Sequence, residues 1–213
     1  MSSNPELDAM QREATRQRIL EAGFRLFAAR TIGKVAMTDV AEAAGLGVAT
    51  VYRHFSTKTA LAAEISAWVW ETYMARASVQ SAGKTATAAQ KYEFFLDSFL
   101  DLYRSRRDLL RYNQFFNVYI QSEEDVSEES LAPFRRVVAE LQQRFDAVYE
   151  QAKTDGTLRT DLPSAEIFLP SLHLMLAAVT RYAVGLLYVG DRPPETELLL
   201  LKKMLLREFA REP

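Results

Sequence analysis

The chain has no cysteine and only two histidines, His54 and His173, among its 213 residues. The absence of cysteine excludes a disulfide framework and any thiolate metal site. Two histidines are too few for a zinc site built on imidazole without heavy help from carboxylates. We therefore expect neither a metal nor another cofactor.

A long, unbroken apolar run is also absent. The most apolar stretch, near residues 167–190, is interrupted by Pro170, His173 and Arg181, so we expect a buried helix there rather than a membrane span. The N-terminal segment MSSNPELDAMQREATRQR is polar and does not resemble a secretory signal peptide. These features favour a cytoplasmic protein with no membrane partner.

An excess of positive charge is absent, because 26 Lys/Arg stand against 28 Asp/Glu and the formal net charge is −2. This value argues against nucleic-acid binding over the whole surface. The distribution is uneven, however: residues 1–61 carry eight Lys/Arg and six Asp/Glu, whereas the remainder carries 18 and 22. A mildly basic N-terminal part on an acidic body suits a protein that meets DNA at one end.

Helical periodicity is present throughout, and no segment shows a convincing strand pattern. Gly156 is an expected helix C-cap, and Pro163 an expected helix start. The pattern predicts an all-α protein of about nine helices. They cover 10–29, 37–44, 48–54, a segment opening at Lys58, 88–105, 108–121, 128–154, 163–189 and 194–211.

The most informative segment is residues 38–58, TDVAEAAGLGVATVYRHFSTK. Ala41 has only a methyl group, so a second helix can cross close to it. Gly45 stands where the turn needs a positive φ, and Val51 points back into the crossing. This pattern predicts a helix-turn-helix whose second helix exposes hydroxyls and cations, the groups that meet phosphates and base edges.

On these residues the chain resembles the TetR family of transcriptional regulators (TetR/AcrR type). The match is sharpest over 16–61, and the run T-V-Y-R-H-F-x-x-K-x-x-L, Thr50 to Leu61, is highly specific for the family. The resemblance implies a three-helix helix-turn-helix DNA-binding domain over 13–73. It also implies a helical ligand-binding and dimerisation domain over 74–213. Such a protein is no enzyme, but a homodimeric repressor that binds a palindromic operator on double-stranded DNA and is released by a small-molecule effector.

The resemblance also implies roles for single residues. Tyr52, His54 and Lys58 match positions that touch phosphates, and Arg53 is the best candidate for a guanine contact. Ala36 stands where a Ser or Thr commonly caps the helix, so we expect Asp39 or Thr38 to compensate in part. The expected DNA-binding residues are Thr38, Gly47, Val48, Ala49, Thr50, Tyr52, Arg53, His54 and Lys58.

Aromatic and hydrogen-bonding side chains are mixed in the helices of the second domain. Most of them could simply fill a helical core, but such mixtures also line small-molecule pockets. For an apolar, aromatic or lipid-like ligand, the candidate lining is Trp70, Tyr73, Phe99, Tyr103, Phe115, Tyr119, Tyr149 and His173.

The last two helices carry more apolar residues than one core can cover. Packing within the protomer and a four-helix dimer interface both account for this pattern. The candidate interface residues are Leu172, Leu176, Val179, Ala183, Leu198, Leu201, Leu205 and Phe209.

Two other function classes remain open at this point. The first is an all-α enzyme that uses the aromatic cavity, although the chain shows no persuasive nucleophile–base pair. The second is an architectural DNA-binding protein without a ligand, for which sequence-independent affinity and a steep salt dependence are typical.

Overall fold

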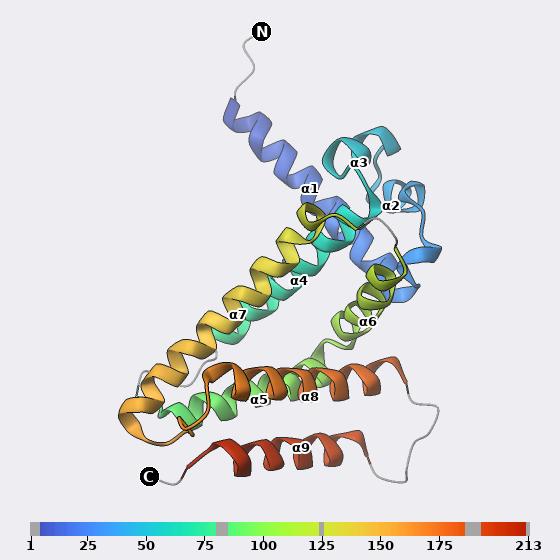
Figure 1. Cartoon of the computed structure of the whole chain (residues 1–213). Coiled ribbons are helices and arrows are strands. Elements are labelled where there is room, and N and C mark those ends of the chain that lie inside the picture. Colours follow the sequence, from blue (N-terminus) through green and yellow to red (C-terminus); the bar gives the residue numbers. More distant parts are fainter. Residues whose placement is uncertain (1–4, 80–84, 124–125, 186–192, 212–213) are drawn as a thin grey trace. The chain divides into compact units, whose positions relative to one another are not determined.

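The computed structural model describes residues 5–79, 85–123, 126–185 and 193–211. These residues are almost entirely helical, which confirms the all-α class (Figure 1). The helices are α1 (Pro5–Ala29), the 3-10 helix η1 (Ile32–Lys34), α2 (Met37–Ala44), α3 (Val48–His54), α4 (Lys58–Val79), α5 (Ala88–Ser105), α6 (Arg107–Ser122), α7 (Glu128–Asp155), α8 (Ser164–Val184) and α9 (Pro194–Phe209).

The observed helix bounds follow the expected ones closely, with two differences. α1 begins at Pro5, five residues before the start of the helix expected over 10–29. α8 ends at Val184, because Gly185 takes a φ of 93° that a helix does not contain. The expected continuation of this helix over 186–189 lies outside the described residues.

The chain forms two compact units, and neither is contiguous in sequence. Unit 1 consists of Met1–Trp70 and Tyr112–Arg136, and unit 2 of Glu71–Arg111 and Val137–Pro213. The sequence-based boundary after residue 73 lies close to the end of the first segment. The inclusion of part of α6 and α7 in unit 1 had no signal in the sequence.

The core of unit 1 forms where α1 meets α2, α4 and α6. Phe24 of α1 is central, because its ring contacts Trp68 edge-on at 6.2 Å between centroids and Tyr112 at 5.6 Å. The Tyr112 hydroxyl donates a hydrogen bond to the carbonyl of Ala62. Residues far apart in the sequence therefore fix α4 and α6 against α1, the helix that precedes the helix-turn-helix.

In unit 2, α5 packs beside α8 and α9, which run antiparallel to each other (Figure 1). An aromatic cluster joins α5, α7 and α8: Phe95 contacts the rings of Phe99, Phe145 and Phe168 at 5.2 to 5.9 Å between centroids. Tyr92 is fully buried and hydrogen-bonds Ser171 at 2.7 Å. Much of the aromatic content of the second domain is thus used for packing.

Asp155 joins the end of α7 to the start of α5. Its carboxylate accepts hydrogen bonds from the backbone N–H groups of Ala88 at 2.8 Å and Thr157 at 3.0 Å. Partial burial alone would raise the pKa of this carboxyl, but the hydrogen bonds from Thr157 and Ala88 outweigh it and lower the pKa to about 2. Asp155 therefore stays charged and holds together two segments that are 67 positions apart.

α8 is long and apolar enough to cross a membrane by its length and composition, and 33% of its most apolar window is buried. One such helix is weak evidence for a span, because core helices of soluble proteins have the same composition. The expected burial holds for only one side of α8. Leu169 and Leu174 are exposed on the other side, as are Leu199, Leu200 and Met204 of α9.

Candidate nucleic-acid interface

The turn between α2 and α3 has the geometry that the sequence predicts. Gly45 takes φ 64° and ψ 42°, a left-handed conformation that caps α2. Its N–H donates to the carbonyl of Glu42, and the N–H of Leu46 donates to that of Ala41 at 2.9 Å, which closes the helix end as in a Schellman motif. Ala41 and Val51 are buried at the crossing. The helix-turn-helix predicted for residues 38–58 is therefore confirmed as a structure.

The start of α2 compensates for the missing cap hydroxyl. The backbone N–H of Ala36 donates to Oδ2 of Asp39 at 2.9 Å, so the expected role of Asp39 is confirmed, while Thr38 is exposed beside it. At the other end of the motif, Thr57 caps α4 by accepting a hydrogen bond from the N–H of Ala60 at 3.0 Å.

The outward face of α3 carries the residues expected to read DNA. Tyr52 is 50% exposed and Val48 is 38% exposed, and Arg53 is exposed beside Thr50, whose hydroxyl its Nη2 reaches at 3.4 Å. Thr50 and His54 are half-buried, while Gly47 and Ala49 are exposed. One helix therefore presents a phenol, a guanidinium and small apolar groups from a fixed backbone, the combination that reads base edges and phosphates.

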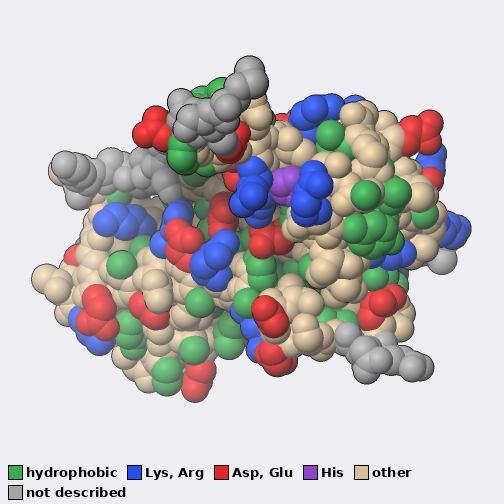
Figure 2. Space-filling model, turned by 90° about the horizontal axis from the view of Figure 1, so that it is seen from above, with side chains coloured by type: hydrophobic (Ala, Val, Ile, Leu, Met, Phe, Trp, Pro, Cys, Tyr) green, Lys and Arg blue, Asp and Glu red, His purple; other side chains and the backbone are tan. Residues whose placement is uncertain are grey.

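Two helices contribute positive charge around His54. Burial, followed by the charges of Arg53 on α3 and of Arg12 and Arg16 on α1, lowers the pKa of its imidazole, against a smaller opposing effect of Glu13. Figure 2 shows a histidine with Lys/Arg side chains on both sides. Arg16 is itself paired with Glu64 of α4. Neutral imidazole is thus favoured in the free protein.

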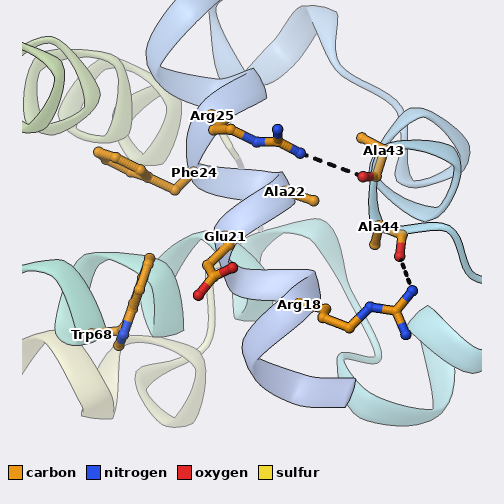
Figure 3. A pocket seen from close by; sticks show the side chains of 8 residues that line it. All are labelled: Arg18, Glu21, Ala22, Phe24, Arg25, Ala43, Ala44 and Trp68. Carbon is orange, nitrogen blue, oxygen red and sulfur yellow. Dashed lines mark hydrogen bonds between the residues drawn. The ribbon is translucent and has the colours of Figure 1, made fainter. Parts of the chain in front are cut away.

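Two arginines of α1 bind the C-terminal end of α2. Nη2 of Arg18 donates to the carbonyl of Ala44 at 2.6 Å, and Nη2 of Arg25 reaches that of Ala43 at 3.4 Å. Both border a pocket of about 400 Å³. Figure 3 shows α1 crossing this pocket, with Phe24 and Trp68 on one side and the two alanines on the other. Cations at a helix C-terminus are favourable, so these arginines fix α2 and the turn that follows it.

Lys58 makes contacts within unit 1 that the sequence did not predict. Its ammonium donates to the carbonyls of Val35 at 3.3 Å and Gly33 at 3.4 Å, and it lies 5.4 Å from the ring centroid of Tyr119. The ammonium is therefore engaged inside unit 1, and its expected contact with a phosphate stays a prediction.

The residues expected to line a ligand pocket are divided between the two units. Trp70, Phe115 and Tyr119 belong to unit 1, and Tyr73, Phe99, Tyr103, Tyr149 and His173 belong to unit 2. The Tyr73 and Tyr149 hydroxyls each donate to a backbone carbonyl at 2.6 Å, those of Ser98 and Leu162. His173 is exposed on α8 and is not part of the packed interior of unit 2. For all of these residues the pocket stays a prediction.

The expected dimer residues also need correction. Val179, Leu198, Leu205 and Phe209 are at most 7% exposed within the single chain, so they form the core of unit 2 and leave no surface for a second copy. Leu172, Leu176, Ala183 and Leu201 are half-buried. The sequence shows that these helices are apolar on more than one side, but not which side packs inward.

Sequence reasoning missed the functional neighbours that come from distant segments. Arg18 and Arg25 are seven positions apart, so they share a face of α1, which is a detectable signal. The contact between Tyr119 and Lys58 has no such signal, because the two residues belong to different helices.

Comparisons with other proteins agree with this geometry. The family model of bacterial regulatory proteins, tetR family, matches residues 19–65. An HTH-type transcriptional regulator of Mycobacterium tuberculosis is 39% identical over 61 residues, which are 29% of this chain and 30% of that protein. The matched part thus spans under a third of this curated relative.

Solved structures extend the likeness of the fold to nearly the whole chain. A transcriptional regulator from Saccharomonospora viridis, in complex with choline, has a TM-score of 0.73 and 18% identity, and the match covers 94% of this chain and 100% of the other. The fatty acid degradation regulator FadR from Bacillus halodurans has a TM-score of 0.70 and 14% identity, with 97% of both chains covered. With the motif geometry described above, these matches identify residues 19–65 as a helix-turn-helix of the tetR family of bacterial regulatory proteins, and they show that the whole chain has the fold of solved transcriptional regulators.

Proposed function

We propose that the protein is a transcriptional repressor that binds a palindromic operator as a homodimer and is released by a small apolar or aromatic ligand. The observation that carries this proposal is the face of α3. Val51 is buried beneath it, while Tyr52 and Arg53 project from the same short helix. A helix so presented is suited to the major groove, with Arg53 toward base edges and Tyr52 toward the backbone.

Pairing of two copies follows from the size of the reading surface. α3 has seven residues, and one such helix reads too few base pairs for a specific site. Unit 2 offers a surface for pairing, because Leu169, Leu174, Leu199, Leu200 and Met204 are exposed on its neighbouring helices α8 and α9. Several large apolar side chains left exposed on two helices that pack together favour an interaction site there. We place the dimer contact on these five side chains.

A small-molecule effector is supported by the fold rather than by a defined site. The Saccharomonospora viridis regulator with the same fold is in complex with choline, so helices in this arrangement can hold a small molecule. The aromatic side chains of unit 2, such as Phe99 and Tyr103, make an apolar or aromatic compound the favoured class here.

Selection of bound sequences from random duplex DNA is the decisive experiment. The full-length protein is expected to enrich an inverted repeat, with one half-site for each copy. An Arg53→Ala variant should then relax the preference at one base position in each half-site. Enrichment of no sequence, with equal affinity for all duplexes and a steep salt dependence, would instead indicate an architectural DNA-binding protein.

Ligand release has its own experiment. Aromatic and aliphatic carboxylic acids, amides and alcohols can be screened by thermal shift, and each compound that stabilises the protein is then added to the operator complex. A true effector must lower operator affinity, and operator DNA must lower the affinity for that compound by the same factor. A compound that binds equally well to free and operator-bound protein is no effector.

A further inference from the structure

We propose that Tyr119 of α6 is a positioning residue of the DNA-reading surface, because it holds the Lys58 ammonium against the backbone that precedes α2. The expected effect of this contact on DNA affinity rests on the proposed function. The contact itself lies within unit 1 and concerns Lys58, for which we expected a contact with a phosphate.

Tyr119 contacts two consecutive residues at the start of α4. Its ring centroid is 5.4 Å from Nζ of Lys58, and its hydroxyl is 3.2 Å from Oγ1 of Thr59. The phenol is 6% exposed, so its ring face is largely withdrawn from water. A withdrawn ring face attracts an ammonium group more strongly than an exposed one does.

The ammonium in turn holds the connection between α1 and α2. It donates to the carbonyls of Gly33 and Val35, and Val35 directly precedes Ala36, the N-cap of α2. Ile32 and Val35 anchor this connection through side chains that are 0% and 1% exposed. A single ammonium thus joins α4, the connection before α2 and, through Tyr119, α6.

This arrangement predicts an effect of Lys58 that differs from that of a phosphate contact. A lysine on a phosphate releases counterions when DNA binds, so its removal lowers the dependence of affinity on salt. Lys58 is turned onto internal carbonyls, so its removal should misplace α2 and α3 without changing the number of neutralised phosphates. Affinity should therefore fall while the salt slope stays the same.

A double-mutant cycle tests this reading with the duplex that the wild-type protein selects. The variants are Lys58→Met, Tyr119→Leu and their combination, with affinity measured by fluorescence anisotropy at several salt concentrations. Each single change should weaken binding about three- to tenfold. The affinity of the double variant should lie within about twofold of that of the single variant with the lower affinity.

Three further variants separate positioning from general damage. Tyr119→Phe keeps the ring face and should stay within about twofold of wild type, and Lys58→Arg keeps the cation and should restore most of the affinity that Lys58→Met loses. Val118→Ala changes an exposed neighbour on α6 (54% exposed) and is the matched control. Effects of Lys58→Met and Tyr119→Leu that simply add would overturn the proposal, as would a salt slope lowered by about 1 for each copy in Lys58→Met.

Urea unfolding of the same variants makes the test independent of DNA. Coupling between Lys58 and Tyr119 in the free energy of unfolding supports the contact even if no duplex is ever enriched, in which case only the proposed function fails. Additive unfolding energies would refute the contact itself.

Discussion

Replacement of Gly45 by alanine should destabilise unit 1 through the backbone of the turn. The φ of 64° forces any Cβ into a left-handed conformation, which costs roughly 1–2 kcal/mol. The new Cβ would also lie 3.2 Å from Nη2 of Arg18. That guanidinium can move by a few tenths of an ångström, but only by weakening its hydrogen bond to Ala44, which holds the end of α2.

Gly33→Ala is the matched control, because a Cβ at Gly33 meets nothing within 4 Å and no left-handed φ is required there. Both substitutions lower the conformational entropy of the unfolded chain, which stabilises the folded state by about 0.4–1 kcal/mol in each case. This contribution cancels when the two variants are compared. Gly45→Ala should therefore be less stable than Gly33→Ala by about 1–2 kcal/mol.

Urea unfolding followed by tryptophan fluorescence measures this difference. Both tryptophans, Trp68 and Trp70, belong to unit 1, so the signal reports on that unit. Gly45→Asn should recover part of the loss, since asparagine tolerates the left-handed region better than alanine. Equal stability of Gly45→Ala and Gly33→Ala would refute the claim that the turn depends on a positive φ.

Four further outcomes are expected. Arg53→Ala should cost operator binding about 1–3 kcal/mol at one base position, measured with a panel of single-base variants; a uniform loss over the panel would assign Arg53 to phosphate. Operator affinity should rise as the pH falls through the ordinary range of histidine. Burial and nearby arginines lower the pKa of His54 in the free protein, whereas a phosphate would raise this pKa in the complex, so the complex takes up protons when it forms. His54→Gln should flatten this dependence on pH, and an unchanged profile in that variant would exclude His54 as its source. Leu200→Glu and Met204→Glu should yield monomers in sedimentation experiments, since a charge on a self-facing apolar surface is costly to desolvate; intact dimers in both variants would move the interface elsewhere. Ser66→Ala should raise the free energy of unfolding by about 1 kcal/mol, because the fully buried hydroxyl has no hydrogen-bond partner among the described residues; a loss of similar size would point to a partner that the structure does not show.

Local geometry was predictable from the sequence because it depends on neighbouring residues. Gly45, Val51 and Ala41 fall within one short stretch, and their spacing alone determines how two helices can cross. The same holds for Asp39, which lies within one helical turn of Ala36, whose backbone N–H donates a hydrogen bond to its carboxylate. Helix bounds followed for the same reason, since caps and breaks are local signals.

The partners of these helices could not be predicted in the same way. Periodicity showed that α8 and α9 are apolar, but Val179 and Leu198 turned out to be core whereas Leu200 is exposed. Which apolar side packs inward depends on α5, and a single helix does not encode it. The internal partners of Lys58 could not be predicted for a related reason, because Gly33 and Val35 precede it by more than 20 residues and Tyr119 follows it by about 60.

The interleaved composition of the two units has a consequence for synthesis on the ribosome. Phe24 and Ala62 leave the ribosome tens of residues before Tyr112. Tyr112 packs its ring on Phe24 and donates a hydrogen bond to the carbonyl of Ala62. Part of the apolar surface of α1 and α4 therefore stays exposed to solvent until α6 has been synthesised. Partly folded chains that expose apolar surface are prone to aggregate. A fragment that ends at residue 73 would lack Tyr112 and would keep this apolar surface exposed. We therefore expect the helix-turn-helix segment not to fold stably when it is separated from α6.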